Sequence, residues 1–101
     1  MVQTRKQINK MYRDWRRAHG NQKPNRVIVR IIWEDDYYAG DDTTSVATMG
    51  LKPDPWFTNP DADDPNLVWY AGTLDDLWEM RKLGNGSDFV VVEVLEFWKK
   101  K

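Results

Sequence analysis

The sequence predicts an α+β protein in which about four strands form a mostly antiparallel sheet with two helices packed on it. The expected element order is α-β-β-β-α-β. Two segments have apolar residues at helical spacing and begin with a capping threonine. Four other segments are rich in β-branched and aromatic residues and are separated by glycine, proline, asparagine and aspartate. With 101 residues, 41% of them hydrophobic and 31% charged, residues 1–101 are expected to form a single domain.

The first helix is expected over residues 4–19, where Thr4 and Gln7 have the spacing of a capping box. One face of this helix carries the apolar residues Ile8, Met11, Tyr12 and Trp15. The opposite face carries the basic residues Lys6, Lys10, Arg13 and Arg17, which fall within a sector of about 60°. The pattern predicts a helix with one side in the core and one basic side in solvent.

The next two elements are predicted to form an antiparallel hairpin. Its strands are expected over Val27–Trp33 and Thr43–Met49, and the acidic residues 34–42 form a long tip between them. Residues 50–66 then carry four prolines, which cannot donate a backbone hydrogen bond to a sheet. We therefore expect a long irregular loop there, of a kind that is often functional.

The C-terminal third is predicted to contribute a strand, a helix and a strand. A short strand is expected over Leu67–Ala71, and Thr73 caps a helix that runs from residue 74 to about residue 83. Residues 88–99 give the strongest strand pattern, and apolar residues on both faces predict a central strand. Glu93 interrupts one of these faces, and we expect it to form a structural ion pair with Arg30.

Charge is sorted along the chain although the net charge is only −1. Residues 1–30 have a balance of +8, residues 31–80 a balance of −11, and residues 81–101 a balance of +2. Such asymmetry is typical of proteins that act by binding a partner.

Recognisable catalytic, metal and cofactor motifs are absent from the sequence. The one histidine, His19, falls at a helix end without a nucleophile motif, so we interpret it as a capping or packing residue. The segment 61–66 begins like a calcium-binding loop, but Pro65 and Asn66 break the template, which favours a solvated acidic loop. Neither a catalytic residue nor a cofactor nor a metal site is therefore predicted.

The sequence also bears on the compartment. It has no cysteine, a polar N-terminal segment without a signal-peptide pattern, and no apolar run of about 18 residues. These features predict a cytoplasmic protein without a membrane partner.

The leading functional hypothesis is a non-enzymatic protein-binding module, an inhibitor or adaptor whose acidic surface mimics nucleic acid. It would dock on the basic surface of a nucleic-acid-processing complex through acidic and aromatic loops. The predicted contact residues are Glu34, Asp35, Asp36, Tyr37, Tyr38, Asp41, Asp42, Trp56, Phe57, Asp61, Asp63 and Asp64. A small chain without cysteines or motifs has the profile of a phage or mobile-element protein directed against host defence.

Two alternatives belong to other classes of protein. The basic face formed by Lys6, Lys10, Arg13 and Arg17 could bind nucleic acid directly, or an acidic partner. A small metal-dependent enzyme is the second alternative. Opposite charges within one chain also make self-association a reasonable outcome.

Overall fold

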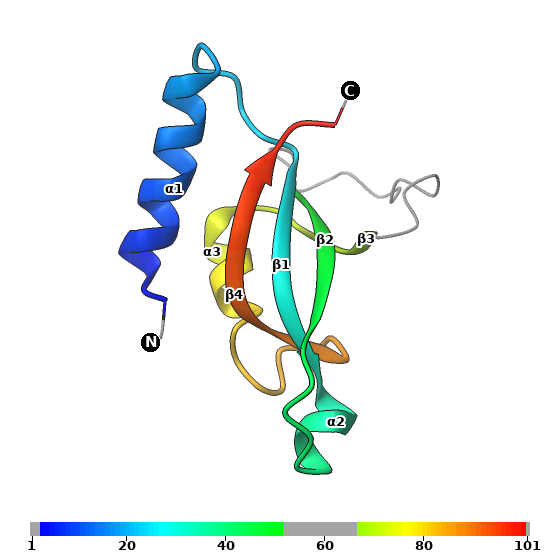
Figure 1. Cartoon of the computed structure of the whole chain (residues 1–101). Coiled ribbons are helices and arrows are strands. Elements are labelled where there is room, and N and C mark those ends of the chain that lie inside the picture. The colour runs from blue at the N-terminus through cyan, green and yellow to red at the C-terminus, as the bar shows by residue number, and fades with distance from the viewer. Residues whose placement is uncertain (1–2, 52–66, 101) are drawn as a thin grey trace.

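The computed structural model describes residues 3–51 and 67–100 of the chain. The elements are α1 (Arg5–Ala18), β1 (Arg26–Trp33), α2 (Glu34–Tyr38), β2 (Ser45–Leu51), β3 (Leu67–Ala71), α3 (Leu74–Glu79) and β4 (Phe89–Trp98). The strands form one sheet in the order β3-β2-β1-β4 (Figure 1). This confirms the predicted α+β class, with the short helix α2 as an addition within the predicted acidic tip.

The sheet is mixed. Strand β1 pairs antiparallel with both β2 and β4, and β2 pairs parallel with β3. The predicted β1–β2 hairpin is therefore confirmed, although β2 begins and ends two residues later than expected. The prediction of a central C-terminal strand is wrong, because β4 lies at an edge of the described sheet.

Side chains rather than a further strand cover the outer edge of β4. The Gln3 side-chain amide donates to the carbonyl of Val94 at 2.9 Å and accepts from its N–H at 2.7 Å. Arg81 donates to the carbonyl of Val92 at 3.4 Å and also to the carbonyl of Gln3. The buried apolar side chains of β4 pack in the core beneath α1.

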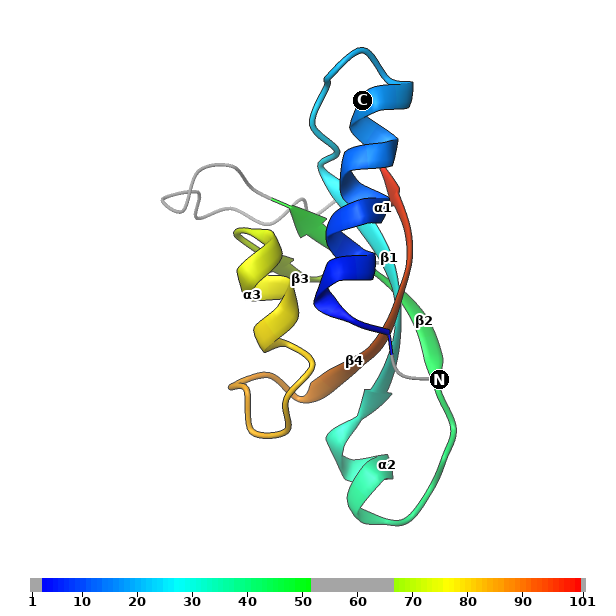
Figure 2. The ribbon, with the colours of Figure 1, turned by 90° about the vertical axis from the view of Figure 1, so that its left-hand side faces the viewer.

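The core lies on one face of the sheet, beneath α1 and α3 (Figure 2). Val27, Val29 and Ile31 alternate along β1 and are completely buried, as a strand with one core-facing side requires. Ile8 of α1 and Leu77 of α3 close over them, and both are at most 2% exposed. Each helix thus contributes an apolar face, and its remaining side chains point to solvent.

Two irregularities in the β1–β4 pairing decide where Glu93 points. The register shifts between Ile28 and Val29 and again between Arg30 and Ile31, which inserts extra residues into β4. Glu93 therefore lies opposite Arg30 and is exposed, so the interpretation that it interrupts a buried face is wrong. The predicted pair nevertheless forms, with Nε of Arg30 3.5 Å from Oε1 of Glu93.

Both predicted helix starts are confirmed, but one helix is shorter than expected. Thr4 and Gln7 form the complete capping box of α1, and Thr73 caps α3 in the same manner. Helix α3 ends at Glu79 instead of near residue 83. After this end the N–H groups of residues 81 and 82 donate to carbonyls three positions back, and the Asn85 side chain donates to the carbonyls of residues 80 and 82.

Candidate functional site

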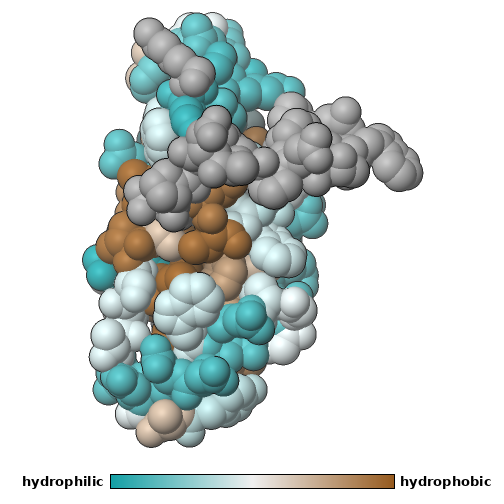
Figure 3. Space-filling model, turned by 90° about the vertical axis from the view of Figure 1, so that its right-hand side faces the viewer, coloured by the Kyte–Doolittle hydropathy of each residue, from teal (hydrophilic) through white to brown (hydrophobic). Residues whose placement is uncertain are grey.

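The acidic tip of the β1–β2 hairpin forms one end of the molecule. We use "acidic tip" for residues 34–42, which comprise α2 and the turn after it. This segment holds five carboxylates, and residues 31–51 contain neither lysine nor arginine. Figure 1 shows α2 at the lower end, away from the C-terminal end of α1. On the face that Figure 3 draws, this end carries hydrophilic residues beside residues of intermediate hydropathy. The tip is therefore a local concentration of negative charge.

Two of the five carboxylates hold the tip in shape. The side chain of Glu34 accepts from the N–H of Gly84 at 3.1 Å, and its own N–H donates to the carbonyl of Asp88 at 2.9 Å. The side chain of Asp41 accepts from the N–H of Thr43 at 2.9 Å and from its hydroxyl. The hydroxyl and the backbone N–H of Thr43 both lower the pKa of Asp41. These contacts fix the tip against the 84–88 turn at one side and against Thr43, just before β2, at the other.

The other three carboxylates are available to a partner. Within the described residues, Asp35, Asp36 and Asp42 make neither an ion pair nor a side-chain hydrogen bond. Between them, Tyr37 is 49% exposed and Tyr38 is 69% exposed. The two rings meet edge to face with centroids 5.7 Å apart. The tip thus combines carboxylates without an ion pair and exposed aromatic surface, and tyrosine is among the residues enriched at protein interfaces.

A shallow hollow of about 440 Å³ lies at the base of the tip. It is lined by Trp33, Glu34, Asp35, Asp36 and Asp88. Within residues 3–51 and 67–100, no group of three or more acidic or histidine side chains is placed to hold a metal ion. The lining of the hollow is acidic, with four carboxylates beside Trp33.

Sequence reasoning did not include Asp88 in this group. Trp33 and Phe89 are partners in the β1–β4 pairing, so the residues that follow Trp33 lie beside those that precede Phe89. Asp88 can be placed beside the tip only when the pairing of β1 with β4 is known, and the sequence pattern did not predict this strand order.

The remaining predicted contact residues do not add to the tip as described. Trp56, Phe57, Asp61, Asp63 and Asp64 lie outside the described residues. The acids of α3 lie away from the tip (Figure 2) and have other roles. Asp75 pairs with Arg5, Asp76 caps its own helix, and Glu79 pairs with Lys82 at 3.1 Å.

Helix α1 presents the predicted basic face to solvent. Its residues Lys6, Lys10, Arg13 and Arg17 are all exposed. Asp14 lies among them, and the hydrogen bond from Lys10 at 2.7 Å lowers the pKa of its carboxyl group. Lys6 and Arg13 make no ion pair with any described residue. The face therefore keeps a clear excess of positive charge.

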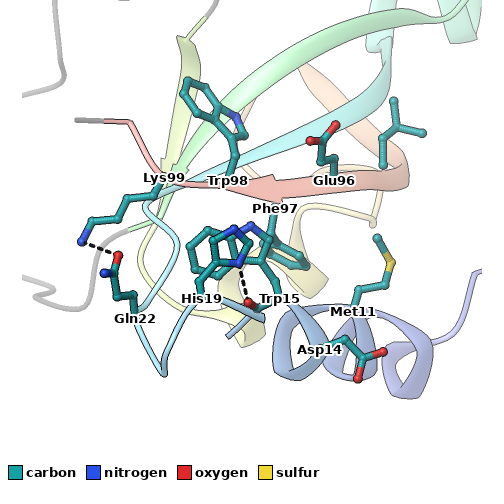
Figure 4. Close-up of a pocket in the computed structure, with 10 residues that line it drawn as sticks. Met11, Asp14, Trp15, His19, Gln22, Glu96, Phe97, Trp98 and Lys99 are labelled. Carbon is teal, nitrogen blue, oxygen red and sulfur yellow. Dashed lines mark hydrogen bonds between the residues drawn. The ribbon is translucent and has the colours of Figure 1, made fainter. Parts of the chain in front are cut away.

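A groove of about 730 Å³ runs between α1 and the end of β4 (Figure 4). Trp15 and His19 stack in it with ring centroids 3.9 Å apart, and Phe97 faces them from β4. Nδ1 of His19 lies 2.7 Å from the carbonyl of Trp15, so this nitrogen carries the proton and donates. His19 is thus a packing and capping residue, as predicted. The groove also contains Asp14 and Glu96 with Lys99, and this mixed charge favours neither an anion nor a cation.

Comparisons of this chain with protein-family models, with curated proteins and with solved structures found no match. Among the described helices, none is long and apolar enough to cross a membrane. The functional argument consequently depends on the acidic tip and the basic face themselves.

Proposed function

We propose that this protein is a non-enzymatic binding protein, an inhibitor or adaptor, that docks on a basic protein surface through its acidic tip. The observation that carries this proposal is the grouping of the unpaired Asp35, Asp36 and Asp42 with the exposed Tyr37 and Tyr38. Carboxylates without intramolecular partners exert an attractive field on a basic surface, which accelerates encounter.

The aromatic residues supply the part of the contact that charge alone does not provide. Solvent-exposed ion pairs contribute about 0–1 kcal/mol each, so three carboxylates give modest affinity. A tyrosine buried at the centre of an interface contributes about 2 kcal/mol or more as a hot spot. Tyr37 and Tyr38 lie beside the free carboxylates and are exposed, which supports a role as the apolar centre of the contact.

The partner in this proposal is a protein that uses a basic groove to hold nucleic acid. A row of fixed carboxylates presents negative charge as a phosphate backbone does, and it could therefore occupy such a groove. An inhibitor of host defence encoded by a phage or mobile element, acting in the cytoplasm, is the biological role that this mechanism fits.

Affinity capture with three forms of the purified protein tests the proposal. The first is the natural chain, and the second is the tip variant Asp35→Asn/Asp36→Asn/Asp42→Asn, which leaves Glu34 and Asp41 in place. The third is the control variant Asp75→Asn/Glu79→Gln/Glu96→Gln, which neutralises the same number of exposed carboxylates elsewhere. Both variants change the net charge from −1 to +2, because each removes three negative charges.

The natural chain and the control variant are expected to retain the same partner at about 50 mM salt and to release it at about 500 mM. The tip variant is expected to retain little of it. The captured protein, purified and mixed with each form, must reproduce this order of binding. Equal retention by all three forms would show that the acidic tip is not the docking surface.

The basic face of α1 supports one alternative function, direct binding of nucleic acid. Lys6, Lys10, Arg13 and Arg17 are exposed along about three turns of one helix. If all four contacted phosphates of duplex DNA, the slope of log affinity against log salt would be about −3.5. Titration of a DNA duplex into the protein at several salt concentrations distinguishes this function from docking through the tip.

A further inference from the structure

We propose that copies of this chain associate head to tail, the acidic tip of one copy docking on the basic face of α1 of the next. This inference concerns the same tip as the proposed function. Self-association is measured on the purified protein alone, however, so either proposal can fail without the other.

The two surfaces are complementary in charge. The acidic tip offers Asp35, Asp36 and Asp42 without an ion pair among the described residues. The basic face offers Lys6 and Arg13, which likewise make no ion pair with a described residue. Opposite fixed charges of this kind attract over about 10 Å at 0.1 M salt.

The two surfaces do not neutralise each other within one copy. The acidic tip lies at one end of the molecule, whereas α1 runs along the sheet toward the opposite end (Figures 1 and 2). The only acids that pair with α1 among the described residues are Asp14, on the helix itself, and Asp75 of α3. Among the described residues no other acid balances the rest of the basic face, and a second copy carries carboxylates without an ion pair at its tip.

The contact joins two different surfaces, so each added copy leaves one tip and one helix free. Such a heterologous contact extends into an open chain unless its geometry closes a ring. The tip is small, because α2 has five residues and is about 7.5 Å long. A contact of this size falls below the area of about 1,200 Å² typical of stable complexes, so the association is weak and depends on concentration.

Neutralised variants provide a test that is specific for a head-to-tail contact. The tip variant Asp35→Asn/Asp36→Asn/Asp42→Asn keeps a functional basic face. The helix variant Lys6→Gln/Arg13→Gln/Arg17→Gln keeps a functional tip. Neither can associate with itself by the proposed contact, but a mixture of the two can form a single pair that cannot extend.

Sedimentation velocity and NMR measure this outcome. The natural chain should rise in apparent mass with concentration at about 50 mM salt. The control variant Asp75→Asn/Glu79→Gln/Glu96→Gln should do so at least as strongly, because Asp75→Asn also removes an acid that pairs with Arg5 of α1. Their self-association should weaken about tenfold or more at about 500 mM salt. Isotope-labelled tip variant mixed with unlabelled helix variant should show shifted amide signals in α1, and the reverse labelling should show shifts at residues 34–42.

Several results would overturn the proposal. The first is a natural chain that keeps its 12.0 kDa mass at all concentrations and low salt. The second is a tip variant that self-associates as strongly as the natural chain. The third is a pair in which both labelled partners shift in the same segment, because that pattern indicates a symmetric contact. The fourth is a monomeric protein whose α1 signals move only when a DNA duplex is added, which would assign the basic face to nucleic acid.

Discussion

At the scale of single residues, the carboxylates of the acidic tip divide into two groups with different roles. Glu34 and Asp41 accept hydrogen bonds from backbone N–H groups and keep the tip folded. Asp35, Asp36 and Asp42 make no such contact with the described residues and are free to face a partner. A substitution therefore tests either the shape of the tip or its charge, and the two can be separated.

Asp41 is expected to titrate below the ordinary aspartate range. Thr43 donates to the charged form, so the folded pKa lies below the unfolded value. The contribution of Asp41 to stability is consequently present above the unfolded pKa and is lost as the pH falls through the folded pKa. Carboxyl NMR of the tip measures this pKa directly.

The variant Thr43→Val is the matched control for Asp41. It removes the hydroxyl donor and keeps the backbone N–H, so the pKa of Asp41 should move only part of the way back to its ordinary value. An Asp41 that titrates at its ordinary pKa in the natural chain would contradict the described contacts.

Gln3 is expected to stabilise the free edge of β4. The variant Gln3→Ala loses both hydrogen bonds to Val94 and should lower the free energy of unfolding by about 1–2 kcal/mol. The variant Gln3→Glu keeps an acceptor for the Val94 N–H but sets a carboxylate oxygen against the Val94 carbonyl, so it should not recover this stability. Urea denaturation measures the stability, and hydrogen exchange of the Val94 amide locates the effect. An exchange rate that Gln3→Ala leaves unchanged would mean that this side chain does not cover the edge.

At the scale of elements, the structure explains which features the sequence could predict. The two helix starts were predicted correctly because Thr4 and Thr73 act through bonds to residues three positions away. The position of β4 could not be predicted, since its edge is covered by residues distant in sequence, Gln3 and Arg81. The orientation of Glu93 depends on two register shifts that have no sequence signal of their own.

The candidate site shows the same division. The charge and exposure of the tip follow from a segment that combines five acids and two tyrosines without a basic residue. The helical form of residues 34–38 and the proximity of Asp88 depend on how β1 and β4 end together. Local composition therefore predicted the chemistry of the tip, whereas its geometry required the fold.

Close packing between β2 and β3 gives a prediction for a single glycine. A Cβ atom added at Gly50 would overlap the ring of Tyr70 on the neighbouring strand. The variant Gly50→Ala should therefore lower the free energy of unfolding by about 1–3 kcal/mol. Thermal or urea denaturation measures this loss.

The double variant Gly50→Ala/Tyr70→Ala is the control for this clash. Because removal of the ring makes room for the new methyl group, the double variant should lose less stability than the sum of the two single variants. Strict additivity would indicate that the two residues do not compete for the same space.

At the scale of the whole molecule, the charge sorting along the chain becomes a separation in space. Six of the nine basic residues of residues 1–30 lie on α1, and the acids of residues 34–42 gather at the opposite end of the sheet (Figure 1). The near-zero net charge therefore conceals two surfaces of opposite charge. Salt should weaken any contact made by either surface.

The central claim is that the acidic tip docks on a basic protein surface. The most direct test compares the affinity of the captured partner for the natural chain, the tip variant and the control variant at low and high salt. We predict that Asp35→Asn/Asp36→Asn/Asp42→Asn weakens binding about tenfold or more at low salt, while Asp75→Asn/Glu79→Gln/Glu96→Gln binds as the natural chain does. Equal affinity of the natural chain and the tip variant would contradict the claim.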